Sequence, residues 1–343
     1  MQISNLTKYA AGVMVFAALL AGCSSGSSST LSPSSSGMQN AVRSGHLQPL
    51  RVGGLLVASA MLPLVKPIHV PTALDKHRKR KPDEYISNFY SSDVLQFDYP
   101  RGDASTGTIS GASEYQGECA QNRKKAFWVV ASGADEIEEF AYGGRRPIST
   151  LSEAAGEPAA CSIDAKSGNL AVTILENGDV VIFTDASGTG TTVADGLASS
   201  FFPTYDGSGD LFVDGITKSD TYGVVEMASG SSSFKAVRLP NTIEFPGGMQ
   251  WDGTYVTLDD QDAHTIYQYT CARDSCSLKG TVALTGSSDC VQTWITKTIV
   301  YCPDAANDNA TVYKYPAGGS PIATLTGSFD LPIGAVSITN VMR

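Results

Sequence analysis

From residue 83 onward, short apolar runs alternate with polar turns in a unit that recurs about every 43 residues. Each unit consists of a short strand, a turn, an apolar strand, a polar loop, a second apolar strand and a Gly/Thr-rich stretch. The clearest copy covers residues 160–183. Positions 119, 161, 204, 249 and 292 are equivalent and lie 42, 43, 45 and 43 residues apart. This period predicts a β-propeller in which each unit is one blade.

The ends of the repeat predict how the ring closes. Residues 85–88, 94–97 and 106–109 supply three strands of a first blade, but no innermost strand precedes them. The stretch 335–338 matches the missing strand, 43 residues after Gln292. The 261 residues of 83–343 therefore predict an all-β, six-bladed β-propeller, closed by pairing of the C-terminal strand with the first blade.

Two stretches carry a family resemblance. Residues 167–172, and residues 85–88 followed by Val94 and Phe97, are similar to NHL-repeat and SMP-30-like six-bladed propellers. The resemblance covers about residues 83–343 and implies an architecture, because such blades serve many functions. The Asn-His-Arg triplet that gives the NHL family its name is absent, and residues 262–266 come nearest to it.

The first 82 residues are organised differently. Lys8 precedes an apolar stretch too short to span a bilayer, and the sequence Leu20-Ala21-Gly22-Cys23 resembles the lipobox of bacterial lipoproteins. The resemblance implies a signal peptide over 1–22 and a lipidated Cys23, and Ser24 favours the outer membrane or cell surface. An ordinary secretory signal is the alternative. A Ser-rich tether over 23–37 and a basic, partly ordered leader over 38–82 follow.

Charge divides the chain at the same place. Residues 1–82 hold nine Lys/Arg and one acid, a net charge of +8. Residues 83–343 hold fifteen Lys/Arg and thirty-three acids, a net charge of −18. So acidic a body repels phosphate backbones, which excludes nucleic acid as the partner of the propeller.

Six cysteines remain once Cys23 is set aside, an even number that is typical of an oxidising compartment. Cys271 and Cys276 flank a four-residue hairpin loop and are predicted to pair. Cys290 and Cys302 are predicted to pair across the next hairpin. Cys119 and Cys161 pair only by elimination, and free thiols are the alternative there, because equivalent inner strands of neighbouring blades could stand too far apart.

Four oxygen-bearing side chains follow the innermost strand of consecutive blades at one equivalent position: Asn122, Asp164, Asp206 and Asp252. Such a ring could hold calcium or another divalent cation, as the Glu/Asn/Asp set of SMP-30-like lactonases does. Capping of the tight turn after the strand is the favoured interpretation, and no cofactor is then expected. Asp259, Asp260 and Asp262 form a second acidic cluster that we expect in a solvated loop.

Other catalytic groups are scarce. His264 is the single histidine of the propeller and is expected as an exposed turn residue, which disfavours triads and multi-histidine zinc sites. Trp128, Trp251 and Trp294 occupy core-strand positions; packing between blades is the simpler interpretation, and a sugar-stacking surface on the channel face is the alternative. The sequence thus predicts a lipid-anchored, extracytoplasmic module that binds a protein or a glycan. A metal-dependent lactonase or esterase is the alternative function.

Overall fold

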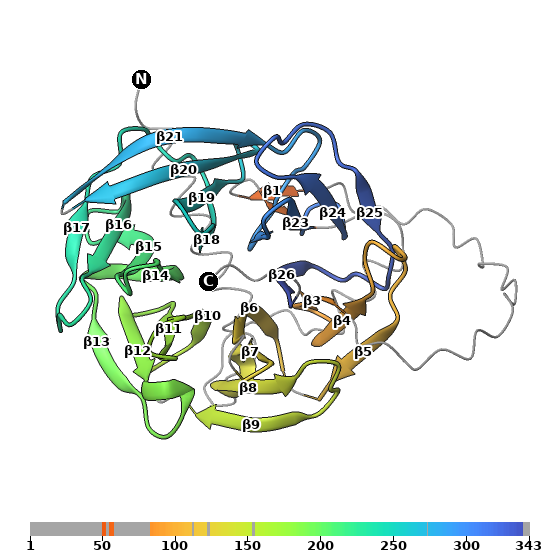
Figure 1. Cartoon of the computed structure of the whole chain (residues 1–343), viewed down its shortest axis with the longest axis horizontal. Coiled ribbons are helices and arrows are strands. Elements are labelled where there is room, and N and C mark those ends of the chain that lie inside the picture. Colours follow the sequence, from red (N-terminus) through yellow and green to blue (C-terminus); the bar gives the residue numbers. More distant parts are fainter. Residues whose placement is uncertain are drawn as a thin grey trace, which may run out of the picture.

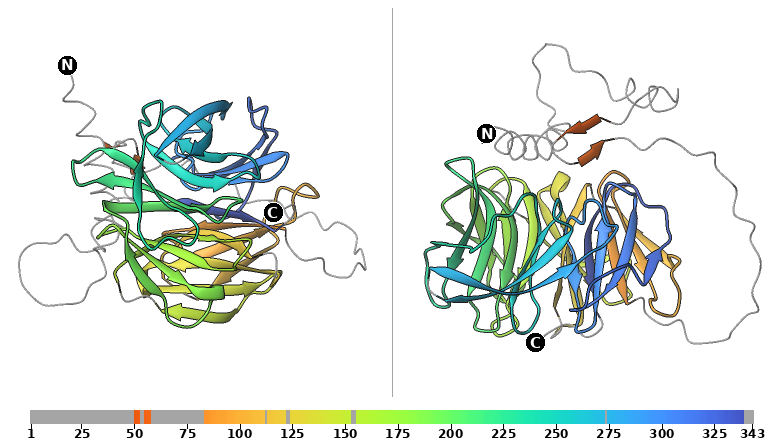
Figure 2. Two further views of the ribbon diagram at one scale, coloured as in Figure 1. Left: turned by 60° about the vertical axis from the view of Figure 1, so that its left-hand side comes forward. Right: turned by 90° about the horizontal axis from the view of Figure 1, so that it is seen from above.

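The propeller prediction is confirmed. The computed structural model describes residues 50–52, 55–57, 83–111, 113–121, 124–152, 155–272 and 274–338. Within residues 83–338, six four-stranded antiparallel sheets stand as blades around a central axis, with one strand of each blade at the axis and one at the rim (Figures 1 and 2). The predicted lipidation site Cys23, the predicted signal peptide over 1–22 and the predicted tether over 23–37 lie outside the described residues.

The strands of each blade follow from the inside outward. Blade 1 contains β26 (Pro332–Ser337), β3 (Glu84–Asn88), β4 (Asp93–Phe97) and β5 (Gly107–Ser110). Blade 2 contains β6 (Tyr115–Gln121), β7 (Ala126–Ala131), β8 (Glu136–Ala141) and β9 (Pro147–Ser152). Blade 3 contains β10 (Pro158–Ile163), β11 (Leu170–Ile174), β12 (Asp179–Phe183) and β13 (Thr191–Ala194).

The second half of the ring has the same plan. Blade 4 contains β14 (Leu197–Tyr205), β15 (Leu211–Thr217), β16 (Tyr222–Met227) and β17 (Lys235–Val237). Blade 5 contains β18 (Pro246–Trp251), β19 (Val256–Asp260), β20 (Thr265–Ala272) and β21 (Ser275–Ala283). Blade 6 contains β22 (Trp294–Ile295), β23 (Ile299–Asp304), β24 (Asn309–Lys314) and β25 (Ala323–Leu325).

The ring closes as the sequence predicts. The C-terminal strand β26 pairs antiparallel with β3 and forms the inner strand of blade 1, with Val336 opposite Tyr85 and Ser337 opposite Glu84. Because this one sheet joins the two ends of the propeller sequence, blade 1 has four strands like the others and the ring is closed.

Apolar side chains fill the spaces between the blades. Successive side chains of a strand point alternately towards the two neighbouring blades, so the inner strands are buried on both faces. Between blades 1 and 2 the rings of Tyr85 and Phe127 lie 4.0 Å apart, and those of Phe127 and Phe140 lie 5.5 Å apart. Trp128 is fully buried, as the packing interpretation predicts.

The propeller contains three disulfides among the described residues, and they are the three pairs named from the sequence. Cys271–Cys276 joins β20 to β21 at a Cα–Cα distance of 4.0 Å. Cys290–Cys302 joins the segment before β22 to β23 at 5.1 Å. Cys119–Cys161 joins the inner strands of blades 2 and 3 at a Cα–Cα distance of 5.7 Å, so neighbouring inner strands do approach closely enough to be bridged. The disulfides indicate folding in an oxidising environment.

One expectation about the acidic residues is wrong. Asp259 and Asp260 are fully buried at the end of β19, and only Asp262 lies in an exposed turn. The strand runs over 256–260 and so ends four positions beyond the stretch at 254–256 that predicted it. Asp260 is buried because its carboxylate accepts hydrogen bonds from the backbone N–H groups of Glu244 and Phe245, which fixes the connection from blade 4.

Outside the propeller, β1 (Leu50–Val52) and β2 (Leu55–Val57) pair antiparallel within the leader. In the part of the chain that the structure covers, no helix is long and apolar enough to cross a bilayer.

Candidate functional site

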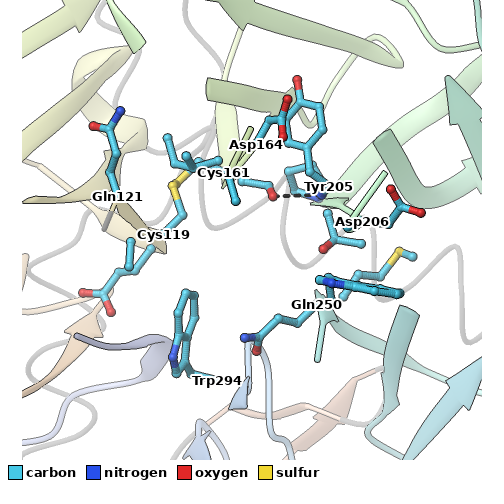
Figure 3. Close-up of a pocket in the computed structure, with 18 of the residues that line it drawn as sticks. Cys119, Gln121, Cys161, Asp164, Tyr205, Asp206, Gln250 and Trp294 are labelled. Carbon is cyan, nitrogen blue, oxygen red and sulfur yellow. Dashed lines mark hydrogen bonds between the residues drawn. A yellow bond between two sulfur atoms is a disulfide. The ribbon is translucent and has the colours of Figure 1, made fainter. Parts of the chain in front are cut away.

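A pocket of about 570 Å³ opens at one end of the central channel. Its wall comes from the inner strands of blades 2 to 6 and the residues next to them, at equivalent positions of the repeat (Figure 3). These segments are residues 118–121, 161–166 with Gly168, 203–207, 249–251 and 292–294. The repeat therefore brings the same point of five blades to one cavity.

Just before the pocket-lining residues, neighbouring inner strands approach each other closely at small residues, and we call this narrow stretch the closed end of the channel. The third residue of β6, β18 and β26 is glycine in each case, and that of β10 is Ala160. A Cβ atom on Gly117 would lie 2.7 Å from the Cα atom of Ala160, and one on Gly334 would lie 2.4 Å from the carbonyl oxygen of Gln116. The inner strands thus meet backbone to backbone at this end, which only residues with little or no side chain permit.

Two glutamine side chains hold the pocket wall together. Gln292 donates to the carbonyl oxygen of Glu118 at 3.0 Å and accepts from its N–H at 2.9 Å. Gln250 makes the same pair of bonds to Ile295, at 2.8 and 2.6 Å. In each case the side-chain amide bonds to the C=O and N–H of one residue, as the backbone of a paired strand would. These bonds fix the spacing between the two segments at the pocket wall.

The aspartates of the sequence-predicted ring bind the turns that follow them. Asp164 accepts from the N–H groups of Lys166 and Ser167 at 2.9 and 3.2 Å and from the Ser167 hydroxyl. Asp206 accepts from the N–H groups of Ser208 and Asp210 at 2.7 and 2.9 Å. These are the bonds that the turn-capping interpretation predicts.

Asp252 has a further role. One oxygen accepts from the N–H groups of Thr254 and Tyr255, both at 2.7 Å, and the other accepts from the Tyr315 hydroxyl of blade 6. Asp164 and Asp206 line the pocket, whereas Asn122 lies outside the described residues. Among the residues that the structure describes, no group of three or more His, Cys, Asp or Glu side chains is arranged to hold a metal ion.

Aromatic side chains supply much of the pocket wall. Trp294, Trp251 and Tyr205 line it, and Figure 3 shows Trp294 and Gln250 extending into the opening, with the Cys119–Cys161 disulfide on another side. The indole N–H groups of Trp251 and Trp294 are buried and have no hydrogen-bond partner. The two tryptophans expected to pack between blades therefore also face the channel.

Glu118 is the most unusual residue of the wall. Its side chain is fully buried, and neither carboxyl oxygen has a hydrogen-bond partner. Burial raises the pKa of this carboxyl well above its usual value, because the charged form would lose its hydration without compensation. Burial therefore favours the protonated form of Glu118, and a protonated carboxyl can both donate and accept a hydrogen bond.

Nucleophilic chemistry finds little support in this wall. His264 lies in an exposed turn before β20, as predicted, and no histidine lines the pocket. The hydroxyl of Ser162 accepts a hydrogen bond from the Tyr205 N–H at 3.0 Å and has no base beside it among the lining residues. The wall offers hydrogen-bonding groups, aromatic faces and a rigid shape, which are properties of a binding site.

Sequence analysis did not identify Glu118, Gln250 or Gln292 as site residues. The signal was weak: Gln250 and Gln292 lie 42 residues apart, close to the blade period, but glutamine is common on strands facing solvent. That these positions face a cavity depends on how closely the inner strands approach at the closed end, which the period alone does not reveal.

Comparison with known proteins agrees with the fold. No protein-family model matches the chain, and no curated protein sequence is significantly similar to it. Among solved structures, the chain is similar to a chain in the crystal structure of a nidogen/laminin complex, with a TM-score of 0.60, 11% identity and coverage of 74% of this chain and 97% of that one.

Two bacterial structures are similar as well. A protein of unknown function from Bacteroides caccae gives a TM-score of 0.57 at 13% identity, covering 75% of this chain and 98% of that one. A functionally unknown protein from Desulfotomaculum acetoxidans DSM 771 gives 0.52 at 13% identity, covering 75% and 88%. Identities this low establish the shared fold and nothing finer.

Proposed function

We propose that the protein is a lipid-anchored, extracytoplasmic binding module that holds a protein or glycan partner at the channel pocket. The observation that carries the proposal is the pocket itself, because five blades contribute aromatic and hydrogen-bonding groups to one cavity whose volume suits a ligand. The shared fold with a chain of a nidogen/laminin complex is consistent with a role in protein binding.

The rigidity of the pocket wall supports a binding role. The inner strands are joined by the Cys119–Cys161 disulfide and by the Gln250 and Gln292 amide bridges, all at the pocket wall. A site with fixed walls loses little entropy when a ligand binds, so a modest set of contacts gives useful affinity.

The metal-dependent lactonase or esterase is the weaker candidate. Asp164 and Asp206 direct oxygens into hydrogen bonds of their own turns, and Asp252 serves its turn and Tyr315. A divalent cation needs several oxygens that converge on one point, and these carboxylates diverge towards their separate turns.

The test exposes the labelled full chain to peptide and glycan arrays, beside a Trp294→Ala variant whose thermal unfolding is measured in parallel. We expect at least one ligand class to bind the wild type and to be lost from the variant, because the substitution removes a wall of the pocket. Metal content and turnover of generic lactones and esters are assayed on the same protein. Turnover that disappears in Asp164→Ala at unchanged folding would establish the hydrolase instead.

Anchoring is tested separately. The lipobox-like sequence around Cys23 leads us to expect that the wild type enters the detergent phase of a phase separation, because acyl chains contribute roughly 0.8 kcal/mol per buried methylene. Cys23→Ala removes the acylated thiol and should move the protein to the aqueous phase. Identical partitioning of the two proteins would contradict lipidation at this residue.

A further inference from the structure

The unsatisfied polar atoms of the pocket wall indicate what kind of ligand fits it. Two are donors, the indole N–H groups of Trp251 and Trp294, and neither has an acceptor. The third group is the carboxyl of Glu118, whose two oxygens have no partner. Buried polar groups without partners are uncommon in folded proteins; others lie elsewhere in the propeller, but these three share one wall, where a single ligand can supply the missing bonds.

Charge excludes one ligand class. Asp164 and Asp206 bring two carboxylates to the wall, against the single ammonium of Lys166. The Lys166 ammonium donates to the carbonyl oxygen of Ser208 at 2.9 Å and so is engaged with the next turn. Within an acidic propeller this arrangement repels phosphate, sulfate and carboxylate ligands.

Hydrogen-bond direction separates the remaining classes. A lysine or arginine side chain of a partner only donates, so it could serve Glu118 but leaves both indole N–H groups unsatisfied. A sugar hydroxyl both donates and accepts, so one ring that carries several hydroxyls can serve all three groups.

Aromatic faces add a second match. Trp294 projects into the opening, and Trp251 lies against the turn of blade 4, where a Cβ atom on Gly207 would be 3.2 Å from its ring. The C–H face of a pyranose is apolar and packs against such rings, while the hydroxyls at its edge meet the polar wall.

We propose that the channel pocket binds a non-anionic sugar, meaning a neutral or amine-bearing pyranose, either free or at the end of a short glycan. The inference rests on the proposed binding function and assigns the ligand class to it. Its wall provides stacking through Trp251 and Trp294 and hydrogen bonds through their N–H groups and the Glu118 carboxyl.

The test measures saturation-transfer NMR and calorimetric binding of the full chain with five tetrasaccharides. Four carry no acid: cellotetraose, maltotetraose, N-acetylchitotetraose and the amine-bearing chitosan tetramer. The fifth, tetragalacturonate, carries a carboxylate on every ring. We expect saturable binding of at least one of the first four at up to millimolar concentration and no binding of tetragalacturonate.

Three variants locate the binding. Trp294→Phe and Trp251→Phe each keep an aromatic ring and remove one N–H donor, and each should weaken the sugar about fivefold, the equivalent of about 1 kcal/mol for one neutral hydrogen bond. Tyr90→Phe removes a hydroxyl group from an aromatic side chain outside the pocket and should leave binding unchanged. The two tryptophan variants are independent, so misfolding of one leaves the other as a test.

The outcomes separate the two proposals. Failure of all four non-anionic sugars, equal binding of tetragalacturonate, or wild-type affinity in both tryptophan variants would overturn the sugar assignment. If a peptide on the array binds the wild type and is lost from Trp294→Ala while no sugar binds, the binding function stands and the sugar assignment is wrong. If no ligand of either class binds, both proposals are wrong.

Discussion

The two ends of the central channel are built from the same inner strands, yet neighbouring strands meet closely at the closed end and leave a pocket at the other. At the closed end Gly117 faces the backbone of Ala160, and Gly334 faces that of Gln116. Beyond this point β6 carries Glu118 and Gln121, and blades 5 and 6 carry Gln250, Trp251 and Trp294, whose side chains line the pocket. Side-chain volume at one or two positions per blade thus decides whether the channel is filled by backbone or left as a cavity.

The two ends also differ in what holds them together. Close backbone contact is enough at the closed end, whereas the open end relies on directional bonds: one disulfide and two glutamine bridges. A wall with a cavity on one side lacks packing partners there, so specific bonds must replace the lost contacts. The open end should therefore be more sensitive to bond removal, and the closed end to added volume.

The largest effect is expected at the open end from loss of the Cys119–Cys161 disulfide. This bond closes a span of 42 residues, and loop-closure entropy gives it a stabilisation of about 4 kcal/mol. The double variant to alanine should lower the free energy of unfolding by that amount in urea titrations. Removal of Cys271–Cys276, whose span is 5 residues, is the matched control and should cost about 2 kcal/mol. Equal losses would contradict the expected dependence on span.

Titration of Glu84 gives the next effect. Its carboxyl, on β3 opposite Ser337 of β26, accepts hydrogen bonds from the Tyr301 hydroxyl at 2.7 Å and from the Tyr99 N–H at 3.1 Å, but burial outweighs them and raises its pKa to about 7. The folded state then binds a proton more tightly than the unfolded state. The contribution of Glu84 to the free energy of unfolding is therefore greatest below pH 4.5. It falls by about 3 kcal/mol as the pH rises to about 7.

The Glu84→Gln variant isolates that contribution. Asp214 and Glu157, whose pKa values burial raises to about 8, change stability in the same direction, so the wild type should lose stability from all three between pH 5 and 9. Urea titrations at both pH values should show a smaller loss in Glu84→Gln. Glu136→Gln, which removes a half-buried carboxyl on β8, is the control. A wild type that gains stability towards pH 9 would contradict the prediction.

The closed end provides the third effect. Gly117→Ala places a Cβ atom 2.7 Å from the Cα atom of Ala160 and 2.9 Å from the carbonyl oxygen of Ala159, and backbone cannot move aside cheaply. We expect a loss of about 2 kcal/mol in the free energy of unfolding, a usual cost of overpacking. Gly102→Ala, with no atom within 4 Å of the new Cβ, is the control and should leave stability nearly unchanged.

The repeat made the ring predictable and left the pocket hidden. A spacing of about 43 residues between positions such as Cys161 and Thr204 gives the blades, and the position of residues 335–338 within that spacing gives the closure, since both depend on chain length and strand pattern. The pocket depends on the distance between inner strands, which is a tertiary quantity. Glycines such as Gly117 and Gly334 could be seen in the sequence, but their facing partners could not.

The acidic residues show the same division. Asp164 and Asp206 follow an inner strand in the sequence, and the local turn decides their bonds, so capping was predictable. Asp259 and Asp260 have no such local signal, because β19 continues through them and the backbone that Asp260 binds comes from the connection between two blades. Short-range patterns predicted the short-range bonds and failed for the long-range ones.

The smallest effect concerns the turn at the pocket mouth and separates a cap from a metal ligand. Asp206→Ala removes the acceptor of the Ser208 and Asp210 N–H groups and should cost about 1 kcal/mol of stability. Asp206→Asn keeps an oxygen in that place and should stay within a few tenths of a kcal/mol of the wild type. A turn cap needs only an acceptor oxygen, which asparagine keeps. A cation site also needs the negative charge, which asparagine lacks. If thermal unfolding shows that calcium raises the melting temperature of the wild type but not of Asp206→Asn, the carboxylate binds a metal; we expect calcium to change neither protein.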